Sequence, residues 1–346
     1  MLAPCLALAD ADKQRGCTRS SPDVAEIIQY PALYNFRLEN DKFSGTDSGY
    51  TSGVNFSWVS ANLQDYLHDP CLPPWVRQFN QFFEAAHPSA GTSRNMVVTA
   101  GQLMFTPQDR VRTDVIRTDR PYAGWLYLGL GYNARNDQRM DSVEVNLGIV
   151  GPAALGQQSQ NFIHDLRGKP RFNGWDNQLK NELGIQLVAE RKKRIWEYKG
   201  RAGPQLDAIA HYGASLGNVK TYLNTGLTLR IGSLVPNDFG TSPIRPGGDS
   251  NAPLESHVTQ RFSEGGLHAF ISADARVVAR DIFLDGNTFT DSPRIEKRRF
   301  VGDIAGGFAW QWPGGKLAYA RYIRGKEFSA QSASHGYGSV TLSFEH

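Results

Sequence analysis

Short segments in which apolar and polar residues alternate recur along the whole chain. In residues 51–60, Val54, Phe56 and Trp58 alternate with glycine, asparagine and serine. Residues 141–150 repeat this pattern, and so does the end of the chain. A period of two with one apolar face is typical of a β-strand. The pattern therefore predicts strands, each followed by a turn or a loop.

Further segments share these features and bring the number of predicted strands to about twelve. They are residues 33–40, 96–105, 124–132, 183–192, 204–212, 220–231, 266–279, 297–311 and 316–325. An even number of strands of about ten residues is typical of a bacterial outer-membrane barrel. Polar residues on the second face favour a wet lumen over the dry core of a soluble β-sandwich, the alternative fold. We predict an all-β fold for residues 30–346, a single antiparallel transmembrane β-barrel of about twelve strands with a short helix in an outer loop.

Two stretches interrupt the strand pattern. Residues 61–94 contain several prolines and an apolar run from Trp75 to Phe83, which predicts a helical insertion between strands. Residues 232–262 are rich in proline and glycine and predict a loop. No stretch reaches the ~18 apolar residues that a spanning helix needs, and the mean hydropathy is −0.42.

Charge and cysteine content limit the partners and suggest export. The formal net charge is only +3, which gives no electrostatic support for a nucleic-acid partner. Residues 1–11 resemble the end of a secretory leader with a cleavage site after Ala9, although a frayed terminus is the alternative. If Cys5 leaves with the leader, Cys17 and Cys71 could form the disulfide that an exported protein permits.

Three polar connections would meet at the outer rim of the barrel if the N-terminus is periplasmic. They are residues 41–50, 106–123 and 151–182. The first lies within a run from Glu39 to Thr51 that is rich in side-chain oxygen atoms. Hard cations such as calcium prefer oxygen ligands. The spacing is not that of an EF-hand, so an Asx-rich hairpin that caps its own backbone is the alternative.

The other two connections carry candidate catalytic and phosphate-binding groups. Residues 157–165 predict a short helix on which Gln160 and His164, four residues apart, share one face. A histidine there can act as a general base for water, or it can be an ordinary solvated side chain. Arg117 and Arg120 could bind a phosphate bidentately, or they could be rim charges.

Two motifs of soluble enzymes occur in contexts that exclude their usual function. Residues 213–217 match the G-x-S-x-G pattern, but they join two alternating segments and predict a hairpin, not a nucleophile elbow. Residues 129–134 mimic a dinucleotide-binding fingerprint inside a predicted strand with no helix following. We therefore assign no catalytic function to either motif.

Taken in order, the polar motifs resemble those of the lipid A 3′-O-deacylase family (LpxR-type). The resemblance runs from about residue 30 to the C-terminus. It rests on Asn40-Asp41 with Tyr50-Thr51, on Asp119 to Trp125, on Gln160 and His164 after Gly151-Pro152, and on the segment from Gly174 to Glu182. It implies an outer-membrane barrel that hydrolyses the 3′-linked acyloxyacyl group of lipid A with the help of calcium.

The same resemblance assigns functions to individual residues. Asn40, Asp41 and Thr51 match the family's polar residues around the calcium ion. His164 matches its catalytic histidine, which would remove a proton from the attacking water, and Gln160 matches its helical neighbour. In this mechanism the metal polarises the ester carbonyl and stabilises the oxyanion.

One position departs from the family pattern. A characterised member has a glutamate six residues after its histidine, whereas this chain has Pro170. Asp165 or Asp176 could replace that carboxylate, or another group could orient the histidine. Arg120 and Tyr122, in the connection that leads into the next strand, are the residues expected to bind substrate.

The expected partners are a membrane and lipopolysaccharide in the outer leaflet, and we expect a monomer in the bacterial outer membrane. Two alternatives stay open from sequence. One is a non-catalytic barrel that binds lipid or serves as a structural protein. The other is an outer-membrane phospholipase, which would share the fold and the metal but differ in substrate.

Overall fold

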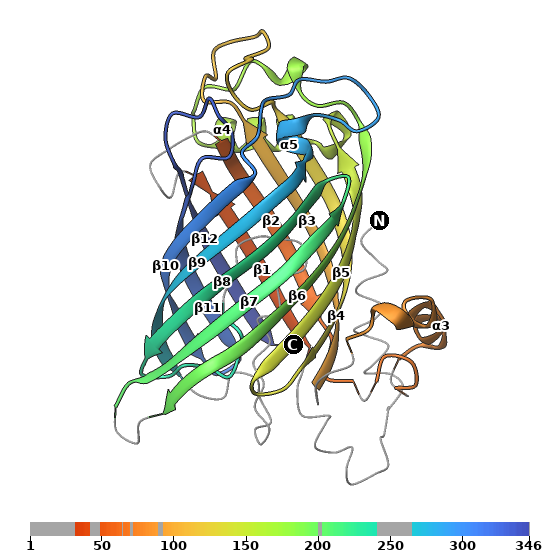
Figure 1. Cartoon of the computed structure of the whole chain (residues 1–346), viewed down its shortest axis with the longest axis vertical. Helices are drawn as coiled ribbons and strands as arrows, with labels where there is room; N and C mark the ends of the chain where they lie inside the picture. The colour runs from red at the N-terminus through yellow and green to blue at the C-terminus, as the bar shows by residue number, and fades with distance from the viewer. Residues whose placement is uncertain are drawn as a thin grey trace.

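The chain forms one closed barrel of twelve antiparallel strands (Figure 1). The computed structural model describes residues 32–41, 49–63, 65–69, 72–88, 93–199, 203–240 and 265–345. The strands are β1 (Leu33–Asn40), β2 (Gly49–Val59), β3 (Ser93–Thr106), β4 (Ala123–Arg135), β5 (Arg139–Val150), β6 (Glu182–Lys199), β7 (Gln205–Gly217), β8 (Lys220–Gly232), β9 (Gly266–Asp281), β10 (Phe300–Trp312), β11 (Gly315–Arg324) and β12 (His335–Glu345). Each pairs with its neighbour in sequence, and β1 pairs with β12 to close the sheet. The predicted all-β barrel is confirmed.

The two faces of the sheet have opposite polarity. On β6, Leu183 and Ile185 are 62% and 47% exposed, whereas Gln186 and Glu190, which point into the barrel, are only 1% and 8% exposed. This is the inverse of a soluble protein, in which apolar side chains are buried. An apolar outer face around a polar lumen is what a strand needs when its outer face contacts lipid.

Paired charges occupy the lumen at the end of the barrel that carries the C-terminus, which we call the inner end. Arg230 on β8 donates from Nε to Asp207 on β7 over 2.8 Å and also binds Asp238, in the segment after β8. Lys316 on β11 donates to the same Asp238 over 2.6 Å. These side chains are at most 2% exposed. Charges without water are tolerated only when they are paired in this way.

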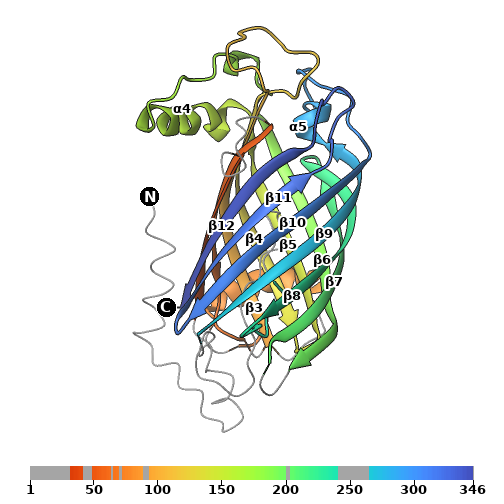
Figure 2. The ribbon, with the colours of Figure 1, turned by 90° about the vertical axis from the view of Figure 1, so that its left-hand side faces the viewer.

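Aromatic rings fill the lumen toward the opposite, outer end. Phe283, on the short helix α5 (Ile282–Asp285), stacks on Phe105 of β3 with ring centroids 4.2 Å apart. Trp125 and Tyr127 of β4 stack on each other at 4.3 Å and belong to the same buried cluster. Figures 1 and 2 show α5 at this outer end. The lumen thus contains ion pairs toward the inner end and stacked rings toward the outer end.

The remaining helices lie in the connections. The inner connection between β2 and β3 contains α3 (Pro74–Phe82) and η3 (Glu84–Ala86), which confirms the predicted helical insertion. The outer connection between β5 and β6 contains η4 (Pro152–Ala154), α4 (Gly156–Leu166) and η5 (Trp175–Asn177). Within the described part of the chain, no helix is both long and apolar enough to cross a membrane.

Predictions for single segments of the chain have different outcomes. Residues 213–217 end β7 at a hairpin to β8, and residues 129–134 lie inside β4, as predicted. The predicted strand 297–311 starts later, at Phe300; Lys297 forms an isolated bridge with Phe328 and an ion pair with Asp285 at 2.8 Å. The predicted leader, the three cysteines and most of the loop 232–262 lie outside the described residues.

The lipid-facing position of Leu187 on β6, 40% exposed, yields a first prediction. Leu187→Arg should destabilise the folded barrel in vesicles by about 2–4 kcal/mol, because a charge would face the hydrocarbon near its middle. Urea unfolding in lipid vesicles, followed by the mobility shift of folded barrels on gels, measures this. The control Leu187→Ala should cost clearly less, and equal losses for the two variants would argue that Leu187 does not face lipid.

Candidate active site

Helix α4 is attached to the outside of the barrel wall. Gln102 on β3 opposes the lipid-exposed Leu126 of β4, and its amide donates to the Ala154 carbonyl of η4 over 2.6 Å. Gly124 lets the helix approach, because a Cβ there would lie 3.3 Å from the Cα of Gly156. The chain enters α4 through Leu155, whose φ of 60° is the one left-handed non-glycine conformation in the described residues. The site is therefore built against the outer surface of the wall.

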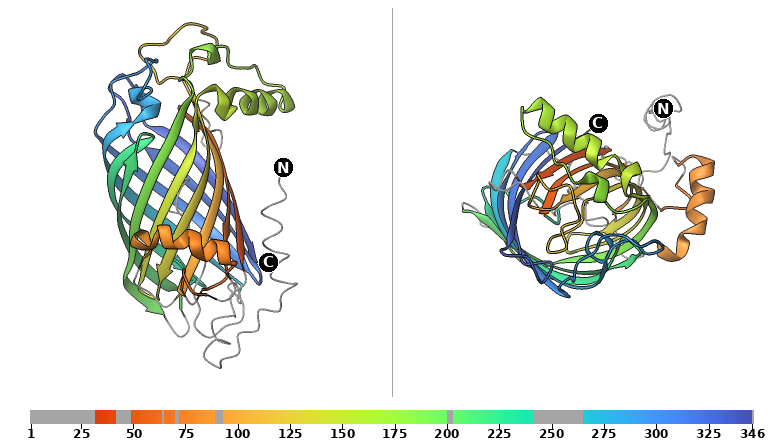
Figure 3. Two further views of the ribbon diagram at one scale, coloured as in Figure 1. Left: turned by 90° about the vertical axis from the view of Figure 1, so that its right-hand side faces the viewer. Right: turned by 90° about the horizontal axis from the view of Figure 1, so that it is seen from above.

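From its attachment to β3 and β4, α4 runs across the outer ends of the first strands. Figures 2 and 3 show it projecting beyond the wall on the side of β1 and β2, and the view from above in Figure 3 shows it crossing them. The ends of β1 and β2 carry Asn40 and Thr51. The predicted metal-binding residues and the predicted catalytic helix thus come from the same part of the outer rim.

His164 points inward from α4 and is only 2% exposed. Its Nδ1 lies 2.6 Å from the backbone carbonyl oxygen of Pro170. A carbonyl oxygen can only accept a hydrogen bond, so Nδ1 must carry the proton and donate it. That tautomer leaves Nε2 with a lone pair, and Nε2 is the nitrogen able to take a proton from water. The edge of Phe172 packs on the imidazole with ring centroids 5.6 Å apart and fixes its plane.

The group that orients His164 is thus a backbone carbonyl and not a carboxylate. Asp165, which the sequence offered as a substitute for the missing glutamate, instead accepts from Arg171 Nε over 2.8 Å. Asp176, the other candidate, is exposed on η5. Pro170 occupies the glutamate position and still supplies an acceptor, because its carbonyl is independent of its side chain.

Gln160 shares the buried face of α4 with His164, as its spacing predicted, and is also 2% exposed. Its Oε1 accepts from the Trp175 indole Nε1 over 2.7 Å. This bond fixes the rotation of the amide, so Nε2 is its donor end. That Nε2 is buried and has no hydrogen-bond partner among the described residues. A buried donor without an acceptor is costly unless a water or a ligand completes it.

Tyr122 supports this arrangement from below. It is 3% exposed and packs against Trp175, with centroids 5.1 Å apart, and against Phe172. Burial raises the pKa of Tyr122 to about 12, so its hydroxyl is neutral at physiological pH. The three rings form one buried cluster that holds both Gln160 and His164 in place.

Arg120 is buried next to this cluster and forms an ion pair across the barrel. Its Nη2 donates to Glu327, between β11 and β12, over 3.1 Å, and its guanidinium lies 5.1 Å from the Phe105 ring centroid. Burial alone would raise the pKa of Glu327, but the attraction of Arg120 and then Arg324 lowers it to about 2. Nε and Nη1 of Arg120 have no acceptor within the described part of the chain.

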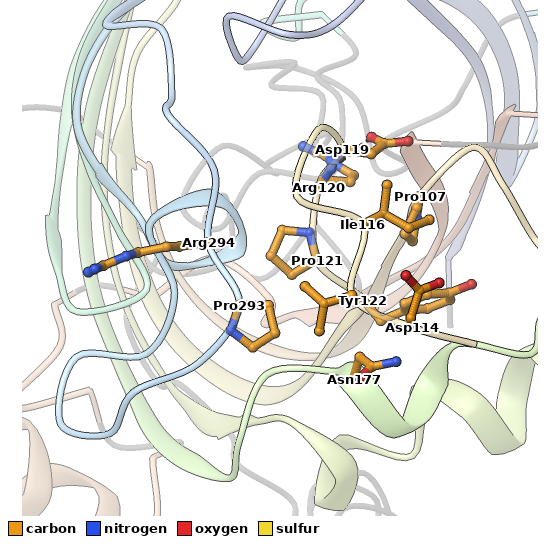
Figure 4. Close-up of a pocket in the computed structure, with 11 residues that line it drawn as sticks. Pro107, Asp114, Ile116, Asp119, Arg120, Pro121, Tyr122, Asn177, Pro293 and Arg294 are labelled. Atoms are coloured by element: carbon orange, nitrogen blue, oxygen red, sulfur yellow. Dashed lines mark hydrogen bonds between the residues drawn. The ribbon is translucent and has the colours of Figure 1, made fainter. Parts of the chain in front are cut away.

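Arg120 and Tyr122, the predicted substrate-binding residues, line one pocket at the outer end (Figure 4). Its other lining residues are Pro107, Asp114, Val115, Ile116, Asp119, Pro121, Asn177, Pro293 and Arg294. The pocket combines cationic and anionic side chains from the β3–β4 and β9–β10 connections. The structure thus places both residues in one pocket, next to the aromatic cluster to which Tyr122 belongs.

The three predicted metal ligands offer only oxygen atoms. Asp41 directly follows β1 and is fully buried, and Thr51 on β2 is 4% exposed, with its hydroxyl 2.6 Å from that of Thr106. Residues 42–48, between them, lie outside the described residues. The described residues contain no group of three or more His, Cys, Asp or Glu side chains that could hold a metal ion. A carboxylate, an amide and a hydroxyl nevertheless match the ligand preference of calcium.

The barrel has an apolar outer face, and helix α4 with His164 is docked outside its wall. These two features define the class of the protein. It is an outer-membrane barrel with a candidate hydrolytic site on the outside of the wall. Within this class, the chain belongs to the LpxR family. The family model described as "Outer membrane protein LpxR" matches residues 3–346. Family membership implies a lipid A 3′-O-deacylase of the outer membrane.

Solved structures agree with this fold. LpxR from Salmonella typhimurium is 16% identical with a TM-score of 0.69, over 91% of this chain and 100% of that one. The β-domain of the Bordetella autotransporter BrkA is 7% identical with a TM-score of 0.43, over 91% and 98% of the two chains. The first shows the same fold, whereas the second is too distant to support an argument. No match was found among curated proteins.

Some contributions to the site were not evident from sequence. The Pro170 carbonyl is a backbone atom and has no signature in side-chain patterns. Glu327 lies 207 residues from its partner Arg120. Trp175 was part of a recognised motif, but its bond to Gln160 follows only from the folding of η5 against α4.

The indole of Trp175 yields a second prediction. Trp175→Phe keeps the ring packing but removes the donor to Gln160, so the amide can rotate away from its present orientation. Loss of one such hydrogen bond costs about 1 kcal/mol, so deacylation should fall several-fold while the barrel stays folded. Quantitative lipid A mass spectrometry measures the rate. The control Trp310→Phe, at an exposed position on β10, should leave it unchanged, and equal rates for both variants would exclude a positioning function for Trp175.

Proposed function

We propose that this chain hydrolyses the ester that links the 3′ acyloxyacyl group to lipid A, with His164 as the base that activates water. The observation that carries this proposal is the buried imidazole whose Nδ1 is held by the Pro170 carbonyl. Such a histidine has one defined tautomer and one basic nitrogen, and its helix lies outside the wall, on the side that lipid contacts. A barrel with only a structural function has no need of this arrangement.

In this mechanism, His164 Nε2 takes a proton from water as the water oxygen attacks the ester carbonyl carbon. The tetrahedral intermediate then collapses, and the bond to the 3′ oxygen of the sugar breaks. The imidazolium returns its proton to that leaving oxygen, which regenerates the enzyme. The Pro170 carbonyl accepts from Nδ1 throughout, and its dipole stabilises the imidazolium less than a carboxylate would.

The Nε2 of Gln160 contributes a fixed donor beside this base. Its amide is oriented by Trp175 and its donor end is buried, so it is available to bind the attacking water or the developing oxyanion. Donors that need no reorganisation during the reaction stabilise a developing negative charge effectively.

Asn40, Asp41 and Thr51 would hold a calcium ion at the end of β1 and β2. When bound, calcium supplies a Lewis acid that polarises a carbonyl and stabilises an oxyanion. The burial of Asp41 and Thr51 keeps these oxygens away from bulk water.

Arg120 and Tyr122 would bind the polar part of the lipid in the pocket of Figure 4. Two N–H donors of Arg120 remain for an anionic group after its bond to Glu327. These charged donors suit an anionic group such as a phosphate, which lipid A carries.

A direct test is expression in a Gram-negative host that makes a hexa-acylated lipid A, followed by lipid A mass spectrometry. The wild-type chain should remove a mass equal to the 3′ acyloxyacyl group. His164→Ala should abolish this loss, because the variant lacks the imidazole that takes the proton. In purified protein, a calcium chelator should also stop the reaction, and calcium should restore it.

The control variant is Asp165→Asn, which changes the next residue on α4 but not the base, and it should keep the activity. Full activity of inserted His164→Ala would contradict the proposed base. No change in lipid A with the inserted wild-type chain, but release of fatty acid from phospholipid, would indicate the phospholipase instead. No turnover of either lipid would favour the non-catalytic barrel.

A further inference from the structure

Helix α3 presents an unusual aromatic face to the surroundings of the barrel. Trp75, Phe79 and Phe82 are 62%, 41% and 87% exposed. They are spaced at i, i+4 and i+7, so they lie along one face of the helix. The opposite side is polar at Gln81, and Arg77 is the only charged residue in the helix. Exposing three large rings to water is unfavourable, which indicates that this face is covered by something else.

The other side of α3 is fixed to the outer surface of the barrel wall. Tyr132 on β4 donates its hydroxyl to Asn80 Oδ1 over 2.7 Å, and Asn80 Nδ2 donates to the Tyr66 carbonyl over 2.6 Å. The Tyr66 hydroxyl donates to the Asn133 carbonyl over 2.6 Å. Val76 packs into the same cluster. These bonds hold the helix rigidly, so its aromatic face has a defined direction.

The surface next to α3 is the lipid-facing belt of the barrel. Tyr132, which α3 covers, lies on the same face of β4 as Leu126 and Leu128, which are 40% and 67% exposed. Toward the inner end of β4, the exposed lipid-facing leucines are thus followed by the patch that α3 covers. The aromatic face therefore continues an existing lipid-contacting surface.

The orientation of α3 also fits a membrane surface. The left view in Figure 3 shows the helix in front of the inner half of the wall, lying across the strands, and the right view shows it beside the wall. A helix in this position is parallel to the membrane plane. Aromatic side chains favour the boundary between head groups and hydrocarbon, and amphipathic helices bind there with the apolar face down.

We propose that α3 is an interfacial anchor that inserts Trp75, Phe79 and Phe82 into the inner, phospholipid leaflet of the outer membrane. The occupant of this face is thus phospholipid and not a protein. Because α3 is bonded to β4, the anchor fixes the height of the inner rim in the bilayer. It acts at the opposite end of the barrel from α4 and does not depend on the proposed reaction.

The test places an environment-sensitive fluorophore on the full-length barrel refolded into vesicles of phosphatidylethanolamine and phosphatidylglycerol. Serine replaces the three native cysteines, and the label is attached at Phe82→Cys or, as a matched control, at Gln81→Cys. These adjacent positions differ by about 100° around the helix. The label at 82 should show blue-shifted emission, quenching by lipids with spin labels on the acyl chain, and loss of quenching by aqueous iodide. The label at 81 should be quenched by iodide.

Two results would overturn the proposal. Equal quenching by iodide at both positions would show that the aromatic face is in water. Protection of the label at 82 from both iodide and spin-labelled lipid would show a protein contact, such as a second copy of the chain. Retention of the gel mobility shift of the folded barrel in both labelled variants ensures that each result comes from folded protein.

Discussion

Backbone amide and carbonyl groups inside a bilayer have no water to bind, so a sheet that crosses it must pair all of them within the chain. In this protein the pairing of β1 with β12, from Leu33 with Glu345 to Asn40 with Gly338, removes the last open edge. Closure divides the side chains into an outer set that contacts lipid and an inner set whose polar and charged groups must pair with one another. The ion pairs around Asp238 and the stacked rings at Phe105 and Phe283 are the consequence inside the barrel.

In the proposed function, the lipid reacts on the outside of the wall. The β5–β6 connection folds back on the wall through Gln102 and Gly124, and it turns His164 and Gln160 toward the barrel. The environment of these two residues consists mainly of rings and of one backbone carbonyl. The imidazole is thereby oriented by the Pro170 carbonyl in place of a carboxylate.

The sequence was sufficient for the barrel because lipid and lumen impose a strict alternation on every strand. It was also sufficient for the shared face of Gln160 and His164, since helical spacing alone determines it. It could not identify Pro170 as the partner of His164, because the interaction uses a backbone atom. Asp165 was the expected partner because it has a carboxylate, as the family glutamate does. The ion pair of Arg120 with Glu327 joins two connections that are 207 residues apart in the chain. In the sequence, the aromatic face of α3 was visible only as an apolar run. The face is exposed because Asn80 and Val76 attach the other side of the helix to the wall.

The central claim about this site is the position at which the substrate ester binds. The structure of the His164→Ala variant with lipid A bound would test it, because the inactive protein should retain the intact substrate. We expect the 3′ ester on the outer face of the wall, between α4 and the ends of β1 and β2, beside Gln160. An ester bound inside the lumen, or outside the wall but away from α4, would contradict this claim.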